Sequence, residues 1–182
     1  AFSVERNATP FMTLLTCFFI LLGRYSGSTD FAVGSPIANR TQAGLEGLIG
    51  TFVNTLVLRL DLSGDPTFSE CVERVRAIAL DAYANQDYSF EKLVENLQVT
   101  RDPSYGPLVQ VLFNMGNAPV GDVDLHGLTW VPFEADTGTA QFDLSMTVET
   151  VFSRKAYLTF NTDLFTRATA ERMLMHYKVL LH

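Results

Sequence analysis

The most regular hydrophobic pattern in the chain lies at residues 55–62, where apolar and polar positions alternate. Leucine occupies every second position from Leu56 to Leu62, and polar residues or Val57 occupy the positions between. A period of two is typical of a strand that has one buried face. The sequence therefore predicts a half-buried strand here.

The segment before this strand is an apolar loop that is rich in glycine. Gly44, Gly47 and Gly50 recur at every third position, with leucine and isoleucine among the residues between them. Glycine permits backbone conformations and close approaches that other residues cannot make. Apolar side chains are also unfavourable in water. We therefore expect this loop to contact another part of the molecule.

The longest apolar run covers residues 11–22 and is interrupted only by Thr13 and Thr16. About a dozen residues are too few to span a bilayer whose hydrocarbon core is roughly 30 Å thick. The run is therefore interpreted as a buried helix. Thr9 and Pro10 supply its cap and its first helical position.

Three further helices are indicated by caps and by apolar residues at steps of three and four. Thr67 and Glu70 form a capping box before the clearest amphipathic helix of the chain. After a break at residues 85–88, Ser89 caps a shorter helix. Thr166 begins the last one.

Strand-forming residues gather in five other segments. A short strand is expected at residues 30–34, closed by Ser35 and Pro36. Four candidates follow the third predicted helix, at residues 108–114, 125–134, 140–150 and 155–161. This order of elements predicts an α/β mixed-sheet layered sandwich.

Length and composition fit one globular unit, with 182 residues, 47% hydrophobic and 18% charged. The net charge of −7 comes without any basic stretch, which argues against nucleic acid as a partner. The chain begins with Ala1 and not with Met, and we interpret it as a piece of a longer polypeptide. Cys17 and Cys71 fall on apolar helix positions, so free buried thiols and a reducing cytoplasm are expected.

The residues show no catalytic constellation of their own. His126, His176 and His182 have none of the spacings that make a metal site. The glycine-rich loop lacks the lysine of a phosphate-binding loop, and the chain has no GxSxG motif. Neither cysteine has a nearby histidine, so no activated nucleophile can be assembled.

Four stretches stand in a characteristic order. The first is YSGSTDFAVG at residues 25–34 with PIANR at 36–40, and the second is IGTFVNT at 49–55 with Arg59. The third is NQDYSFE at 85–91, and the fourth is RDPSYGPL at 101–108. In order and spacing they resemble the motifs of the C-terminal half of a nonribosomal peptide synthetase condensation domain. Two departures are Asn85, where many members have His, and Tyr105-Gly106 in place of a more usual Arg-Asn.

The resemblance implies a chloramphenicol-acetyltransferase-like half domain over residues 1–182. In the family, two such halves form a V around a tunnel, in an enzyme of antibiotic and other secondary-metabolite biosynthesis. Peptidyl carrier proteins bring a thioester donor and an amine acceptor into the tunnel on phosphopantetheine arms, and an adenylation domain is adjacent. The catalytic HHxxxDG motif belongs to the N-terminal half and is absent from this sequence.

The resemblance also implies roles for particular residues, none of them catalytic or metal-binding. Residues 136–142 match a region that latches onto the other half. For Asn54, a side-chain amide that binds a thioester or pantetheine group is weighed against a residue that caps its own turn. Four charged motif residues are expected to be structural: Arg59, Asp87, Arg101 and Asp102. The floor of the tunnel is expected at Gly50, Thr51, Phe52, Val53 and Asn54.

Three functional hypotheses remain open from the sequence. The chain is half of an amide-forming acyltransferase that is inactive alone, a non-catalytic module that docks carrier proteins, or a self-contained acyltransferase. The missing histidine motif counts against the third. Epimerisation and heterocyclisation relatives share this half's fold, so the reaction branch also stays open.

Overall fold

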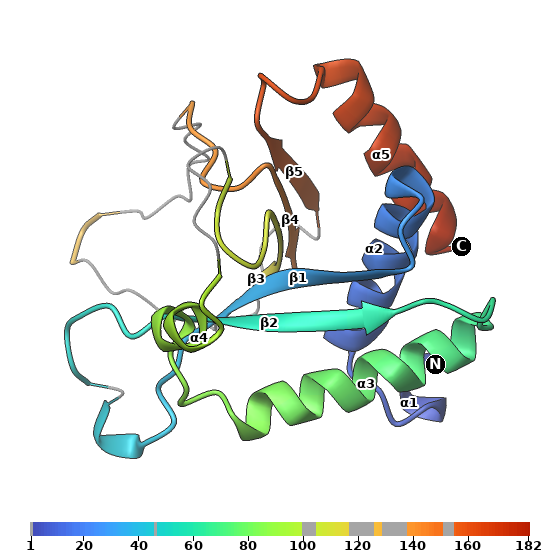
Figure 1. Ribbon diagram of the computed structural model, residues 1–182. Coiled ribbons are helices and arrows are strands. Elements are labelled where there is room, and N and C mark those ends of the chain that lie inside the picture. Colours follow the sequence, from blue (N-terminus) through green and yellow to red (C-terminus); the bar gives the residue numbers. More distant parts are fainter. Residues whose placement is uncertain (1, 46, 100–104, 117–125, 129–137, 151–154) are drawn as a thin grey trace.

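The structure is a computed structural model, and it describes residues 2–45, 47–99, 105–116, 126–128, 138–150 and 155–182. Helices and strands are mixed along the chain (Figure 1). The helices are α1 (Phe2–Glu5), α2 (Pro10–Ser26), the short 3-10 helix η1 (Ala43–Leu45), α3 (Phe68–Ala84), α4 (Phe90–Asn96) and α5 (Arg167–Leu180). The strands are β1 (Asp30–Ile37), β2 (Asn54–Asp61), β3 (Val111–Gly116), β4 (Leu144–Glu149) and β5 (Ala156–Phe160).

The strands form one mixed sheet in the order β2-β1-β3-β4-β5. The outer pairs β1–β2 and β4–β5 are antiparallel, whereas β1–β3 and β3–β4 are parallel. β1 and β2 are paired along their whole length, from Asp30 opposite Asp61 to Ile37 opposite Asn54. The predicted α/β fold with a mixed sheet is confirmed.

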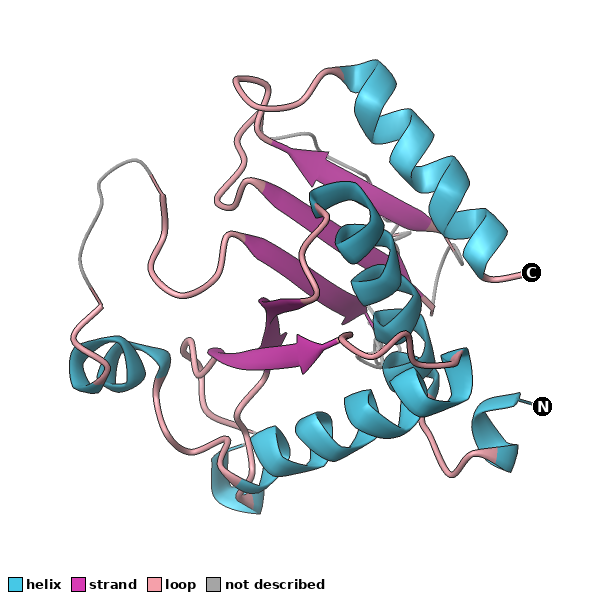
Figure 2. Ribbon diagram, turned by 45° about the vertical axis from the view of Figure 1, so that its right-hand side comes forward, coloured by secondary structure: helices cyan, strands magenta, loops and turns pink. Residues whose placement is uncertain are grey.

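Three helices pack side by side against the sheet, with α2 between α3 and α5 (Figure 2). α3 contacts β2, α2 contacts β3 and α5 contacts β5. α2 is therefore enclosed by the sheet and by both neighbouring helices, which explains why its sequence is apolar on all sides. Its buried residues include Leu15, Phe18 and Phe19.

Aromatic contacts join these layers at Phe18. Its ring centroid lies 5.5 Å from that of Phe113 on β3 and 6.4 Å from that of Tyr177 on α5. The Tyr177 hydroxyl donates a 3.0 Å hydrogen bond to the carbonyl of Leu14, so this polar group is satisfied next to the core. The predicted buried helix is thereby confirmed.

The local signals read from the sequence hold in the structure. Leu56, Leu58 and Leu60 are buried along β2. The predicted caps also form at α2, α3, α4 and α5, where the side chains of Thr9, Thr67, Ser89 and Thr166 each accept a backbone N–H.

Several strand boundaries differ from the expectation. Ser35 and Pro36 do not close β1, which continues to Ile37. The pairing of β1 with β3 is at Gly34, so Pro36 lies beyond that ladder, where a missing N–H is tolerated. β3 begins at Val111 and not at residue 108; Leu108 has a φ of 63°, which a strand does not accommodate.

The other two differences concern the second half of the chain. β4 begins at Leu144 and not at residue 140, since residues 141–143 form a bend. Of the strand expected at 125–134, residues 126–128 form a turn and its end, and the remainder lies outside the described residues.

Candidate functional site

The glycine-rich loop joins the end of β1 to the start of β2 and projects from one end of this strand pair (Figure 1, cyan). Ile49 is fully exposed, and Leu48 and Val53 are more than half exposed. The expectation that this loop contacts another part of the molecule is therefore not met for these three side chains. Exposed apolar side chains that lie together in one loop form a candidate surface for a partner.

Arg40 is a residue of this site that the sequence reasoning missed. Its Nη1 group donates to the carbonyl of Leu45, and Nη2 donates to the carbonyl of Gly50 at 3.0 Å. The guanidinium also lies over the ring of Phe52, 4.4 Å from its centroid. The available signal was a cation next to β1 and an aromatic residue at the far end of the loop.

Asn54 lies where the loop becomes β2, and its side chain is buried. Nδ2 donates to the carbonyls of Gln86 and Tyr88, at 2.9 and 3.0 Å. Oδ1 accepts the N–H groups of Thr55 and Phe90, at 2.9 and 3.0 Å. An asparagine side chain has two donor and two acceptor positions, so all of them are occupied by backbone groups.

These contacts correct the role expected for the Asn54 amide. It has no free hydrogen-bond position for a thioester or a pantetheine amide, and it does more than cap its own turn. It joins the start of β2 to the turn between α3 and α4, where Ser89 caps α4 by accepting the N–H of Lys92. Asn54 therefore fixes the point at which the loop leaves the sheet.

Of the four charged motif residues, Arg59 and Asp87 lie in the described part of the chain. Arg59 on β2 forms a two-pronged ion pair with Asp30 on β1, with Nε–Oδ1 at 2.8 Å and Nη2–Oδ2 at 2.5 Å. This pair crosses between neighbouring strands, in agreement with a structural role. Asp87 is an exposed residue of the turn between α3 and α4. Arg101 and Asp102 lie outside the described residues.

The Arg59 pair affects the titration of Asp30. Hydrogen bonds from Arg59, and to a smaller extent its charge, hold the pKa of the Asp30 carboxyl below its ordinary value. Both side chains are largely exposed, so the pair is screened by solvent and contributes little to the stability of the fold.

The other candidates for chemistry are dispersed. His126 lies in a turn, His176 on α5 accepts or donates a 2.9 Å hydrogen bond with the Tyr25 hydroxyl, and His182 is the last residue. Burial raises the pKa of the Cys17 thiol to about 11, so this buried thiol stays protonated and unreactive. Burial likewise raises the pKa of Cys71.

Neither a metal site nor a membrane span is found among the described residues. No cluster of three or more His, Cys, Asp or Glu side chains in this part of the chain is arranged to hold a metal ion. Among the same residues, no helix has both the length and the apolar character needed to cross a membrane.

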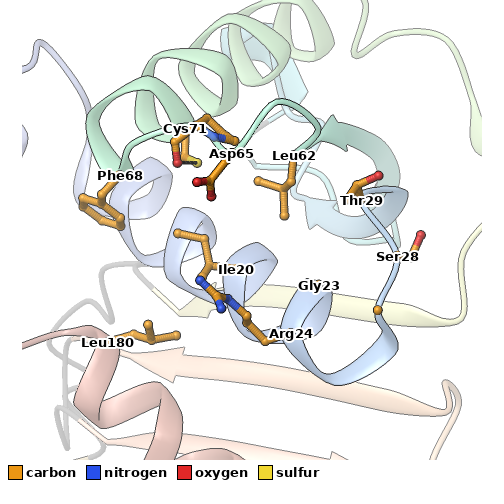
Figure 3. Close-up of a pocket in the computed structure, with 12 residues that line it drawn as sticks. Ile20, Gly23, Arg24, Ser28, Thr29, Leu62, Asp65, Phe68, Cys71 and Leu180 are labelled. Atoms are coloured by element: carbon orange, nitrogen blue, oxygen red, sulfur yellow. Dashed lines mark hydrogen bonds between the residues drawn. The ribbon is translucent and has the colours of Figure 1, made fainter.

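A cavity of about 440 Å³ opens at the opposite end of the β1–β2 pair from the loop. Its walls come from the end of α2, the turn after β2 and the start of α3 (Figure 3). Arg24 and Asp65 are its charged lining residues, and Ile20, Leu62 and Phe68 supply much of its apolar surface. None of the residues predicted for the tunnel floor lies in this cavity.

The region expected to latch onto another half domain is described only in part. Residues 136 and 137 lie outside the described residues, and residues 138–142 precede β4 without forming a helix or strand. The latch therefore stays a prediction.

Comparison with known proteins identifies the family. The profile of the Condensation domain family matches residues 2–182. The chain belongs to this family. A component of the linear gramicidin synthase of Brevibacillus parabrevis is 48% identical over 184 residues, covering 100% of this chain and 4% of that protein. Bacitracin synthase 3 of Bacillus licheniformis is 41% identical over 174 residues, 95% of this chain and 3% of that protein.

Solved structures agree with this condensation-domain assignment. The X-domain from teicoplanin biosynthesis has a TM-score of 0.86 and 26% identity, over 98% of this chain and 42% of that chain. A four-domain nonribosomal peptide synthetase bound to AMP and glycine has a TM-score of 0.83 and 25% identity, over 94% of this chain and 14% of that chain. The chain therefore spans a small part of its long relatives and less than half of the X-domain.

The Asn54 contacts predict that Asn54→Ala destabilises the fold. The substitution leaves the Gln86 and Tyr88 carbonyls and the Phe90 N–H without their partners, which costs about 2–4 kcal/mol in the free energy of unfolding. Chemical denaturation measures this loss. Asn85→Ala is the matched control, because the Asn85 amide donates one exposed hydrogen bond, to Asp81, and its loss costs less than about 1 kcal/mol. Equal effects of the two substitutions would contradict the role of the Asn54 side chain in joining β2 to the turn between α3 and α4.

The Arg59 pair makes a prediction about pH. Because the pKa of Asp30 is lowered by folding, the pair stabilises the fold above the unfolded-state pKa, and this stabilisation is lost as the pH falls through the folded-state pKa. Arg59→Gln should return the pKa of Asp30 toward about 3.9, as followed by carboxyl NMR titration. Arg172→Gln, at an exposed residue of α5, is the control. An unchanged Asp30 titration in Arg59→Gln would rule out this cause.

Proposed function

We propose that this chain is the C-terminal half of a condensation domain that forms an amide bond in a nonribosomal peptide synthetase. The donor is an aminoacyl or peptidyl thioester on one peptidyl carrier protein, and the acceptor is an amine on another. The observation that carries the proposal is the match of the entire chain to synthetase relatives, at 48% identity for a component of a gramicidin synthase.

Two further observations support the assignment to half of a domain. The chain aligns over 98% of its own length with only 42% of the teicoplanin X-domain chain, which leaves room for a second half of similar size. The loop at residues 47–53 also presents Leu48, Ile49 and Val53 to water, as a surface does when its partner is absent. In this proposal, Gly50, Thr51, Phe52 and Val53 form the floor of the tunnel between the halves, and Asn54 anchors that floor.

The reaction requires two carrier-bound groups to be held together. The acceptor nitrogen attacks the thioester carbonyl, a C–N bond forms, and the C–S bond breaks. The proton lost by the amine is balanced by protonation of the leaving pantetheine thiolate. Orientation and acid–base assistance each contribute large factors to such a reaction. In this proposal, the floor residues of this chain orient the donor and acceptor groups. The residue that acts as general base belongs to the preceding half.

The partners in this proposal follow from the same assignment. They are the N-terminal condensation subdomain, two peptidyl carrier protein domains with phosphopantetheine arms, and an adjacent adenylation domain. In this proposal phosphopantetheine reaches the chain on the carrier proteins, and no cofactor is expected to bind the chain directly. The cytoplasmic location expected from Cys17 and Cys71 stays a prediction.

A docking module without catalysis is the second candidate. One solved relative is a complex of the X-domain and OxyB from teicoplanin biosynthesis, with a TM-score of 0.82 and 26% identity to this chain. A relative seen in complex with another protein keeps this interpretation open. Half of an epimerisation or heterocyclisation domain is also compatible with the family, and the products formed distinguish these branches.

The test uses this chain and a longer protein that adds the preceding half, roughly 200 residues by usual domain size. Each is mixed with donor-loaded and acceptor-loaded carrier proteins, and products are followed by mass spectrometry. We expect an amide product from the longer protein and none from this chain alone, because the acid–base group is missing from it. Amide formation by this chain alone, above the uncatalysed rate, would overturn the proposal. Carrier binding by the longer protein without product would favour the docking module.

A further inference from the structure

The connection between β1 and β2 is long for a loop in a compact domain. It covers residues 38–53, and its described residues contain the short helix η1 as their one regular element. Loops longer than roughly 12–15 residues are usually functional or disordered. Gly44, Gly47 and Gly50 add backbone freedom, so ordering this loop costs more conformational entropy than ordering most segments of its length. Some interaction must compensate this cost if the loop is to present one shape.

Pairing of the strands fixes only the base of the loop. Ile37 and Asn54 are the last partners of the β1–β2 ladder, and the Asn54 side chain ties the exit to the turn between α3 and α4. Beyond this base, the exposed residues Leu48 and Ile49 receive no support from the core.

The side chain of Arg40 joins separate parts of the loop to one another. It binds two carbonyl groups, those of Leu45 and Gly50, that lie on opposite sides of the exposed segment 47–49. Its guanidinium also covers the ring of Phe52, with 4.4 Å between the carbon centre of the group and the ring centroid. One planar cation thus connects three points of the loop, of which Leu45 is also held by backbone hydrogen bonds to Gln42 and Leu48.

We propose that Arg40 is a positioning residue, which holds the described loop residues 41–45 and 47–53 in the shape that presents Leu48, Ile49 and Val53 and sets the tunnel floor. This role rests on the proposed function, because the floor acts only in a complete condensation domain. Arginine suits it better than lysine, since the flat guanidinium has several donors in a fixed fork and stacks on aromatic rings. A lysine ammonium is a compact point charge without this fork, so Arg40→Lys should keep the charge but only part of the contacts.

The physical consequence is pre-organisation. A surface already held in its bound shape loses less conformational freedom when a partner or substrate arrives. In a reaction that joins two tethered groups, a displacement of about 1 Å far from the chemistry can cost roughly a hundredfold in rate. Loss of the Arg40 contacts should therefore lower turnover without unfolding the domain.

The experiment compares wild type, Arg40→Gln, Arg40→Lys and the exposed control Arg172→Gln in the longer protein that contains both halves. Amide hydrogen exchange is measured first at the N–H groups of Leu45 and Leu48, which donate to the carbonyls of Gln42 and Leu45. Arg40→Gln should speed this exchange roughly tenfold, with Arg40→Lys intermediate and Arg172→Gln unchanged. The thermal midpoint should stay within a few degrees of wild type for all variants, because the Arg40 contacts described above are with the loop and not with the core.

Amide formation is then followed with loaded carrier proteins. We expect kcat to fall about tenfold or more in Arg40→Gln, with little change in KM for either carrier, and to recover in part in Arg40→Lys. Unchanged exchange in Arg40→Gln would show that Arg40 does not hold the loop. Faster exchange with unchanged kcat would show that holding the loop does not position the reacting groups. No amide from the wild-type protein would instead refute the proposed function, and the exchange comparison would still decide whether Arg40 holds the loop.

Discussion

A buried side-chain amide has to find partners for two N–H groups and one oxygen, and Asn54 finds all of them in backbone groups. Two of the four partners belong to the turn between α3 and α4 and a third is Phe90, the first residue of α4, so a single side chain fixes that turn and the helix start against the start of β2. Leaving such groups unpaired in a buried position is costly, which makes this arrangement specific. It sets the exit of the loop, the start of β2 and the place where α4 begins.

The rest of the candidate site follows from this fixed point. α2 anchors the sheet from one side through Phe18 and Phe113, and the β1–β2 pair carries the loop away from that core. The loop is therefore apolar and yet exposed, held at its base by Asn54 and across its middle by Arg40. Leu48, Ile49 and Val53 on this loop are therefore exposed within the described chain, above a base that Asn54 holds. That combination supports the proposal that the chain is half of a condensation domain.

Sequence reasoning succeeded where the physical cause is local. The alternation at Leu56, Leu58 and Leu60 and the cap at Thr67 depend on near neighbours, and both were predicted correctly. The role of Asn54 was misread because its partners Gln86, Tyr88 and Phe90 lie 32, 34 and 36 residues away.

The extent of β1 and the contacts of Arg40 likewise depend on residues that are distant in the sequence or on the assembled sheet. β1 runs through Pro36 because its ladder with β3 does not extend there, which only the assembled sheet reveals. Arg40 stood inside a recognised motif, but its contacts depend on how the loop returns to Phe52.

The central claim is that this loop is covered in the complete protein. Peptide-resolved cysteine labelling tests it in the longer protein, with Ile49→Cys compared with Thr162→Cys in an exposed turn, because Cys17 and Cys71 are buried. The account predicts that the cysteine at position 49 reacts at least roughly tenfold more slowly than the one at position 162, and equal rates would contradict it.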